Sequence, residues 1–293
     1  MRNKSRPALI AASLAAVLLA SACGQSNTSN ASNASAPPST SPSAPASSAS
    51  GSEAFQSAVD AYRQYVIDQT DQFVKSTDAF VQAIRGGDVD KAKSLYAPSR
   101  MFYERIEPIA ESLGDFDPWI DAREGDVPDA EWRGYHKLEK ALWVDGKLDG
   151  QTAAADQLLQ DVKQLRVKME SVEIDTPMLV TGAVELLNEV SSSKVTGEEE
   201  RYSHTDLYDF AANVEGAKEI YLVLQSDVKK KKPELAAEIE ERFAELDKTL
   251  EPYRKDGGYV LYTALKEDEV KKLSQAIDAL AEPLSQVGSV VEA

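Results

Sequence analysis

The chain has 293 residues, of which 49 are acidic and 32 are basic, so its formal net charge is −17. This charge would repel nucleic acid and anionic lipid surfaces and would attract cations, so we expect neither of the first two as a partner. A single cysteine excludes a disulfide framework within the chain.

Residues 1–22 have the features of an export signal. Arg2, Lys4 and Arg6 give a positive start, an apolar run follows from Ala8 to Ala20, and small residues precede Cys23. The run is shorter than the about 20 residues that a membrane-spanning helix needs, so we expect its removal. Loss of its three basic residues would take the net charge from −17 to −20. Cys23 resembles the acylated cysteine of a bacterial lipobox, and a free thiol after ordinary cleavage is the alternative.

Residues 23–52 form the next segment. After Cys23 they carry no charge and consist almost entirely of Ser, Ala, Asn, Pro, Gly and Thr. Such a segment buries too little apolar surface to offset its conformational entropy, so we expect a flexible tether. With Cys23 acylated, residues 53–293 would be held outside the cytoplasm, on the periplasmic or cell-wall side, and would contact the membrane through the lipid anchor only.

From Glu53 onward the sequence predicts helices almost throughout. Gly and Pro are scattered, β-branched runs are few, and apolar residues recur every three or four positions over about 240 residues. A long amphipathic helix is expected to begin near Phe55 and to stop at Gly86-Gly87, as in a helical bundle.

Two shorter helices are expected next. Asp88 has the character of an N-cap for a helix over residues 91–96, which Pro98 should end. Residues 99–113 should resume the helix, with a bend at Pro108.

Residues 114–131 form an acidic connection, in which seven of the 18 positions are Asp or Glu. A structureless loop of this length is uncommon unless it has a function. A solvated acidic loop remains the alternative for most of these carboxylates.

The helix expected over residues 132–144 carries the pattern HxxE. His136 and Glu139 are three positions apart, so imidazole and carboxylate would leave the same face and could bind one metal ion. The pattern also occurs by chance, and a surface ion pair is the alternative. The chain has only one other histidine, His204.

The remaining helices complete an all-α fold of two four-helix bundles. A helix over about 150–174 closes the first bundle, residues 53–174, and the second bundle would span about 175–293. Segments around His136 and His204 fall at comparable places in the two halves, which favours a pseudo-duplication. The helices expected in the second half lie at about 176–193, 203–227, 233–254 and 266–290.

Several segments resemble the imelysin-like domain of the EfeO/EfeM periplasmic iron-uptake lipoproteins. They are YAPSRMFYERIEPIAE at 96–111, IDARE at 120–124, GYHKLEKAL at 134–142 and YSHTDLYDFAANVEGA at 202–217. The match covers about residues 55–290, and the family pattern GxHxxE is intact as Gly134, His136 and Glu139. Because the tether leads directly into the first helix, we expect the short EfeM-like form without the cupredoxin domain that many EfeO proteins carry.

The resemblance implies a fold and a function. The fold is two four-helix bundles, and the function is iron import through a metal site built on HxxE, beside a membrane iron permease and a haem-type peroxidase. We expect a monomer that binds iron, as Fe²⁺ or Fe³⁺, with zinc, manganese or copper as alternatives. One imidazole with several carboxylates suits such borderline-to-hard cations, and the lack of a thiolate argues against a dedicated copper(I) site.

The candidate ligands form two sets. The first set is His136, Glu139, Glu104, Glu107 and Asp121. Within it, Glu104 and Glu107 could instead pair with Arg100 or Arg105, and Asp121 could cap a turn or bind Arg123. The second, for a possible second site or groove, is His204, Asp206, Asp209 and Tyr202. Here a structural role is the alternative, because Ser203 or Thr205 could cap a helix whose first turn holds the two Asp residues.

Enzyme chemistry is not expected. The zinc-protease motif HExxH is absent, and a lone HxxE lacks the second imidazole and an evident general base. The sequence therefore predicts a tethered protein that captures iron and passes it to a permease. Two alternatives stay open: a metallopeptidase of the imelysin type, and a polysaccharide or polyanion binder that uses a bridging metal.

Overall fold

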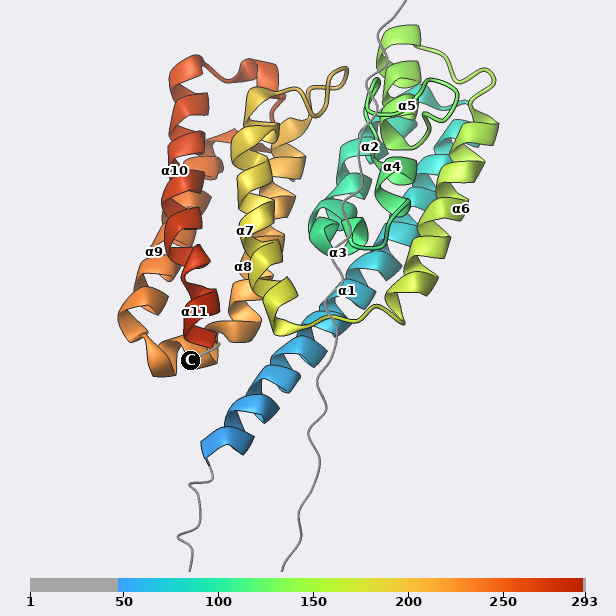
Figure 1. Ribbon diagram of the computed structural model, residues 1–293. Coiled ribbons are helices and arrows are strands. Elements are labelled where there is room, and N and C mark those ends of the chain that lie inside the picture. Colours follow the sequence, from blue (N-terminus) through green and yellow to red (C-terminus); the bar gives the residue numbers. More distant parts are fainter. Residues whose placement is uncertain (1–46, 292–293) are drawn as a thin grey trace, which may run out of the picture. The chain divides into compact units, whose positions relative to one another are not determined.

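The computed structural model describes the backbone of residues 47–291 and the side chains of residues 56–290 (Figure 1). The expected signal at 1–22, the acylation of Cys23 and most of the tether lie outside the described residues. The described residues belong to one compact unit. Within the described part of the chain, no helix has the length and apolar character needed to cross a membrane.

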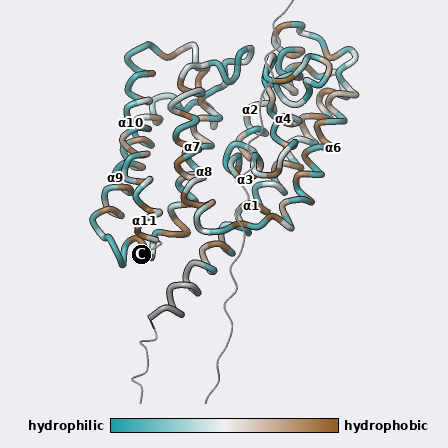
Figure 2. Tube along the Cα trace, viewed as in Figure 1, coloured by the Kyte–Doolittle hydropathy of each residue, from teal (hydrophilic) through white to brown (hydrophobic). Residues whose placement is uncertain are grey.

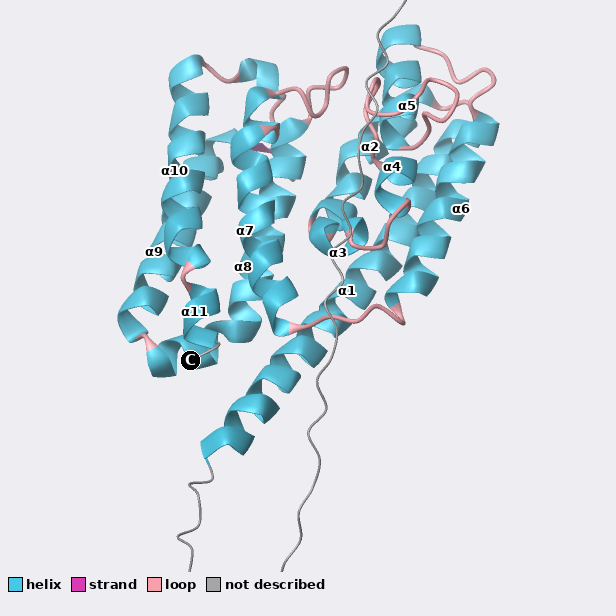
Figure 3. Ribbon diagram, viewed as in Figure 1, coloured by secondary structure: helices cyan, strands magenta, loops and turns pink. Residues whose placement is uncertain are grey.

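The described residues are almost entirely helical (Figure 3). The N-terminal half contains six α-helices and one π-helical segment, and the C-terminal half contains the rest. The elements of the N-terminal half are α1 (Ser47–Arg85), α2 (Val89–Glu104), α3 (Glu107–Glu111), α4 (Phe116–Ile120), α5 (Tyr135–Lys140), η1 (Ala141–Asp145) and α6 (Thr152–Met169).

The C-terminal half adds five α-helices, three short 3₁₀ segments and one small hairpin. In the hairpin, Arg254 pairs with Tyr259 and Lys255 with Gly258 around the expected glycine turn. These elements are α7 (Thr176–Ser192), η2 (Lys194–Thr196), α8 (Asp206–Lys231), α9 (Pro233–Leu250), η3 (Glu251–Tyr253), β1 (Arg254–Lys255), β2 (Gly258–Tyr259), η4 (Tyr262–Ala264), α10 (Glu267–Ser285) and α11 (Val287–Val291).

The N-terminal half is built on α1, which packs against α2 and α6. The shorter helices α4 and α5 contact α6. Tyr135, the first residue of α5, is buried between Phe73 and Phe80 of α1, with ring centroids 5.9 and 5.5 Å away. Its hydroxyl lies 2.8 Å from that of Thr77, also on α1. This aromatic stack fixes the position of the HxxE segment against the longest helix.

The C-terminal half contains a four-helix arrangement, because α7, α8, α9 and α10 each pack on two of the others. Hydrophobic and hydrophilic residues are interspersed along these helices, as expected of amphipathic helices that bury one face (Figure 2). Helix α8 also packs against α1 and α2, so it joins the two halves. In the N-terminal half only three helices are long, and the duplication of a bundle stays a prediction.

Several expected helix boundaries were wrong. The acidic connection at 114–131, expected as a loop, contains α4, and α6 ends at Met169 rather than near 174. Helix α2 continues through Pro98, because the residues on both sides of it, Ala97 and Ser99, are buried and hold the chain in helical form. Helix α1 begins at Ser47, inside the expected tether. The HxxE helix begins only at Tyr135.

The expected bend at Pro108 is a break between α2 and α3. Pro108 has no amide hydrogen, so it cannot bond the carbonyl oxygen of Glu104 four residues earlier. Asn213 of α8 supplies the missing donor, with its Nδ2 2.8 Å from that oxygen. The approach is close, because a Cβ on Gly216 of α8 would lie 2.4 Å from the carbonyl oxygen of Arg105. The break therefore becomes a contact between the two halves.

Candidate metal centre

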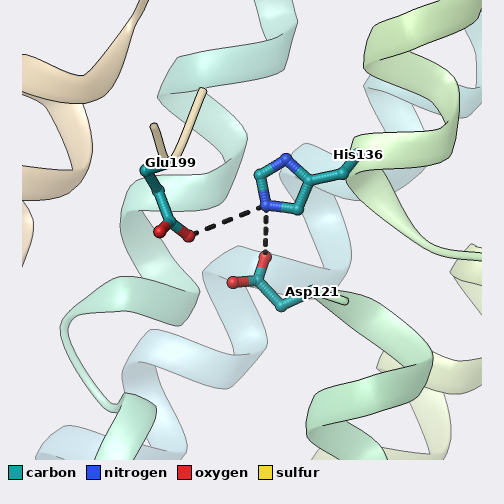
Figure 4. Close-up of side chains that lie close together, drawn as sticks. All are labelled: Asp121, His136 and Glu199. Carbon is teal, nitrogen blue, oxygen red and sulfur yellow. Dashed lines mark ion pairs between the residues drawn. The ribbon is translucent and has the colours of Figure 1, made fainter. Parts of the chain in front are cut away.

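A buried imidazole faces two carboxylates where the two halves meet (Figure 4). His136 lies on α5, Asp121 follows α4, and Glu199 lies between η2 and α8. The His136 Nε2 atom is 3.7 Å from Asp121 Oδ1 and 3.7 Å from Glu199 Oε1. The exposed fractions are 1% for His136, 3% for Glu199 and 8% for Asp121. We call these three residues the His136 cluster.

The two ring nitrogens of His136 have different surroundings. Nδ1 lies 3.2 Å from Glu139 Oε2 and 3.5 Å from the Tyr96 hydroxyl. Nε2 has no hydrogen-bond partner among the described residues, although it is buried. Burial and the nearby Arg100 lower the pKa of His136, but the carboxylates of Glu139, Glu199 and Asp121 outweigh them and raise it to about 10.

Glu139 is held on both of its oxygens. Oε2 faces His136, and Oε1 accepts hydrogen bonds from the backbone N–H groups of Tyr202 at 2.9 Å and Ser203 at 2.7 Å. Burial raises the pKa of Glu139, but the imidazole and these backbone donors outweigh it and lower the pKa below its ordinary value. Glu139 therefore fixes the ring of His136 and connects α5 to the C-terminal half.

The glycine of the GxHxxE pattern is required by two features of the backbone. Gly134 has a φ of +95°, which side-chain-bearing residues rarely adopt. A Cβ at this position would also lie 2.4 Å from the carbonyl oxygen of Ile120, the last residue of α4. This close approach places the start of α5 against the end of α4, so that Asp121 and His136 can face each other.

Arg100 of α2 is a buried cation beside the His136 cluster. Its guanidinium donates through Nη1 to Asp121 and lies 2.6 Å from Glu104 Oε1. Its Nε forms ion pairs with Glu200 at 2.6 Å and Asp209 at 3.4 Å. Because a buried charge is costly without partners, these carboxylates and Arg100 stabilise one another.

A second buried cation lies farther along the same junction. Lys194 of η2 is fully buried, and its ammonium donates to Glu104 and, at 3.0 Å, to Glu107. Glu189 of α7 lies 3.6 Å away. Asn213 also donates to Glu107, at 3.0 Å. We call Lys194 with Glu104, Glu107 and Glu189 the Lys194 cluster.

An acidic cleft of about 320 Å³ connects this region to the surface. Asp121 and Glu199 line it, so the His136 cluster lies at its buried side. Burial and the neighbouring Glu189, Asp117 and Glu185 raise the pKa of Glu111 in its wall to about 7. The residues that line the cleft are Glu107, Glu111, Asp117, Pro118, Asp121, Ala122, Arg123, Asp126, Val127, Glu189 and Glu199.

The His136 cluster has the dimensions of a metal site. Two ligand atoms about 2.1 Å from a tetrahedral ion are about 3.4 Å apart, slightly less than the 3.7 Å separations in the cluster. Three other groups of side chains bring their ligand atoms within 4.8 Å of one another. They are His136, Glu139 and Glu200; Glu107, Glu111 and Glu189; and Glu107, Asp117 and Asp121.

The model of the imelysin family, which carries the label peptidase M75, matches residues 58–287, most of the chain. The chain belongs to the imelysin family.

Two relatives at high identity support this membership. The Efem/EfeO family lipoprotein of Staphylococcus haemolyticus strain JCSC1435 is 46% identical over 244 residues, which is 82% of this chain and 85% of the relative. The Efem/EfeO family lipoprotein of Staphylococcus aureus strain NCTC 8325 is 44% identical over 243 residues, which is 81% of this chain and 86% of the relative.

In this imelysin-family chain, three predicted ligands lie together: His136, Glu139 and Asp121. Glu104 and Glu107 are their neighbours, but Glu104 bonds Arg100 and Lys194, and Glu107 bonds Lys194. None of the groups with metal-site spacing that contain His136 includes either residue. Their role as ligands stays a prediction.

Arg100 was expected only as an alternative partner of Glu104 and Glu107, and it does pair with Glu104, at 2.6 Å. Three residues of the site were not predicted: Glu199, Glu200 and Lys194. The run of glutamates at 198–200, just before the segment that resembles the family, was a usable signal for the first two. Lys194 gave no such signal, because a Lys in a helical pattern is usually exposed.

The residues of the expected second set have separate partners in the structure. Asp206 accepts a hydrogen bond from the backbone of Glu200 at 3.2 Å, Asp209 pairs with Arg100, and the Tyr202 hydroxyl donates to Glu124. His204 has a φ of +57° and belongs to none of the groups with metal-site spacing. The N-cap of α8 is Thr205, without a side-chain cap bond, and Asp206 and Asp209 lie in its first turn.

Proposed function

We propose that the chain is an extracytoplasmic, lipid-anchored protein that captures an iron ion and delivers it to a membrane permease. One observation carries the binding step. The Nε2 atom of His136 is buried, has no hydrogen-bond partner among the described residues, and faces Asp121 and Glu199 beside a cleft that opens to solvent. A buried polar atom without a hydrogen bond is costly, and a metal ion bound to it would remove that cost.

The donor set fits the proposed cargo. One imidazole and two carboxylates suit Fe²⁺, and also Mn²⁺ or Zn²⁺, better than a soft ion such as Cu⁺. A metal ion on Nε2 requires the neutral ring, so binding would release the proton that the surrounding carboxylates otherwise retain on His136. Metal binding therefore replaces the single positive charge of the protonated ring with the larger charge of the metal ion.

The Nε2 atom of His136 is better placed than Nδ1 to bind a metal ion in this structure. On the Nδ1 side, Glu139 already accepts two backbone hydrogen bonds, and Glu200 accepts one from the Ser203 hydroxyl at 2.9 Å. Neither of these carboxylates lines the cleft, whereas Asp121 and Glu199 do. We therefore assign Asp121, His136 and Glu199 as ligands, with Glu139 orienting the ring through Nδ1.

The location and partners rest on the relatives and on the sequence. The relatives are named lipoproteins, and Cys23 follows the small residues expected of a lipobox. The resemblance to the EfeO/EfeM iron-uptake proteins suggests the permease and a haem-type peroxidase as partners in iron transport.

A peptidase role is the less favoured function, although the family label names one. A metal-dependent peptidase needs a carboxylate or imidazole free to take a proton from metal-bound water. Here Asp121 is held by Arg100, Glu199 by Arg123 at 2.5 Å, and Glu139 by backbone donors. We propose a binding protein, and cleavage of an unstructured substrate that depends on added Zn²⁺ would contradict this.

Calorimetric titration of the metal-free protein with Fe²⁺ under anaerobic conditions tests the proposal. We expect one ion per chain and weaker binding in Asp121→Asn and Glu199→Gln. The matched control is Asp129→Asn, which changes an exposed acid of the same acidic connection and should bind like wild type. Equal binding by all four proteins would refute the site. Iron uptake by cells that express each variant would test delivery.

A further inference from the structure

The Lys194 cluster contains a cation where a metal ion could otherwise bind. The ammonium of Lys194 has three N–H donors, and three carboxylates surround it, from Glu104, Glu107 and Glu189. Lys194 has an exposed fraction of 0%. A lysine is almost never buried completely, and here the carboxylates compensate for the loss of its hydration.

Two of these three carboxylates belong to a group that has the spacing of a cation site. Glu107 and Glu189, with Glu111, bring one oxygen each within 4.8 Å of one another. Both residues line the acidic cleft, so an ion could reach them. An all-oxygen set of this kind suits hard divalent ions such as Mn²⁺.

The amide of Asn213 supports the same carboxylates from α8. Its Nδ2 donates to Glu107 and lies 3.3 Å from Glu104 Oε2, while its buried Oδ1 has no hydrogen-bond partner among the described residues. The cluster therefore contains donors that hold the carboxylates in place and one polar acceptor that nothing in the described chain satisfies.

We propose that Lys194 is an internal counter-cation that limits the protein to one metal ion: it pairs with Glu107 and Glu189 and so keeps these carboxylates from binding a second ion with Glu111. Lys194 is a point charge attached to the chain, so it neutralises these acids without leaving the site. Binding of the first ion at the His136 cluster rests on the proposed function. The effect of Lys194 on the binding of a second ion does not depend on it.

The test is the number of Mn²⁺ ions bound per chain, measured by calorimetry and by metal analysis after gel filtration. Wild type should bind one ion and Lys194→Met should bind two, with the second lost again in the double variant Lys194→Met/Glu189→Gln. Lys163→Met removes an exposed lysine and is the matched control, with one ion expected.

The possible outcomes separate the two proposals. One ion in both wild type and Lys194→Met overturns the role of Lys194 and leaves the His136 cluster intact. No ion in wild type but one in Lys194→Met refutes the proposed function and supports the role of Lys194. Two ions in wild type overturn the role of Lys194.

A second measurement does not depend on the folding of the variant. In wild type, nitrogen NMR should show a slowly exchanging ammonium signal from Lys194, because the group is buried and hydrogen-bonded. We expect this signal to persist after one equivalent of a diamagnetic divalent ion, such as Zn²⁺, is added. Its loss at one equivalent would mean that the metal displaces Lys194, which contradicts the proposal.

Discussion

The His136 and Lys194 clusters differ in the kind of cation that each contains. Both are buried at the junction of the two halves, and both hold carboxylates around one basic side chain. Burial lowers the pKa of Lys194, but Glu104 and Glu107 outweigh it and keep the pKa well above its ordinary value, so the lysine stays charged. The imidazole of His136, with a pKa of about 10, can release its proton to solvent when a metal ion binds in its place. We infer that the His136 cluster can exchange a proton for a metal ion, whereas the Lys194 cluster keeps the charge of its lysine.

Substitution of His136 should have the largest effect on metal binding. His136→Ala removes the only nitrogen ligand, so we expect Fe²⁺ affinity to fall at least about 100-fold, a loss of about 2.7 kcal/mol or more. His204→Ala, the matched control, changes the chain's other histidine and should bind like wild type. Calorimetry measures both, and equal weakening in the two variants would contradict the comparison.

A smaller loss is expected when the ring of His136 is retained but less firmly oriented. Glu139→Gln removes the carboxylate that accepts from Nδ1, and such orienting partners typically contribute about 10- to 100-fold to metal affinity. If Glu139 were instead a direct ligand, its loss would match that of His136→Ala. The ratio of the two dissociation constants therefore distinguishes the two roles.

The backbone that brings the His136 cluster together can be tested separately. Gly134→Ala forces a side chain into φ +95° and against the Ile120 carbonyl, so we expect a loss of about 1–3 kcal/mol in unfolding free energy. Gly146→Ala is the matched control, because that glycine has φ +60° but no atom within 4 Å of its added Cβ. Urea unfolding should show the larger loss for Gly134→Ala. Equal losses would mean that the close approach to α4 is unimportant.

The stability of the metal-free fold should also depend on pH. Native His136 has a pKa of about 10, above its unfolded value of about 6.5, so its contribution is lost as pH rises toward 10. Burial raises the pKa of Glu200 to about 8, above its unfolded value of about 4.3, so it also destabilises the fold as pH rises. Asp121 and Glu139 have lowered pKa values, so their contribution is complete above about pH 5.

The metal-free protein should therefore melt at a lower temperature at pH 8 than at pH 5. Saturating Mn²⁺ should raise the melting temperature more at pH 8, because fewer protons compete for the ligands there. Differential scanning calorimetry at both pH values, with and without the ion, measures this. A metal effect that shrinks from pH 5 to pH 8 would contradict an exchangeable charge at His136.

Much of the fold could be predicted from the sequence, because helical periodicity and caps are local. The long first helix, the N-cap at Asp88 and the helices of the second half were confirmed. The failure at Pro98 was not local, since burial of its neighbours overrides the missing hydrogen bond. The partner of the Glu104 carbonyl, Asn213, is 109 residues away and no helical pattern indicates it.

The candidate site was predictable only where its residues are close in sequence. His136 and Glu139 share one helix, and Asp121 lies in an acidic loop, so each had a visible pattern. Glu199 and Lys194 come from the connection before α8, and only the fold brings them to the N-terminal half. The HxxE pattern favoured His136 over His204 as a ligand, but the burial of His136 and the backbone turn at His204 are tertiary features that the sequence does not show.

The most direct test is a crystal structure of the protein grown with Mn²⁺, with the ion located by its anomalous scattering. We predict one peak per chain, about 2.1 Å from His136 Nε2 and between Asp121 and Glu199, with the Lys194 ammonium still bonded to Glu104 and Glu107. A peak among Glu104, Glu107 and Glu189 with the lysine displaced, or a peak on the Nδ1 side of His136, would contradict the account.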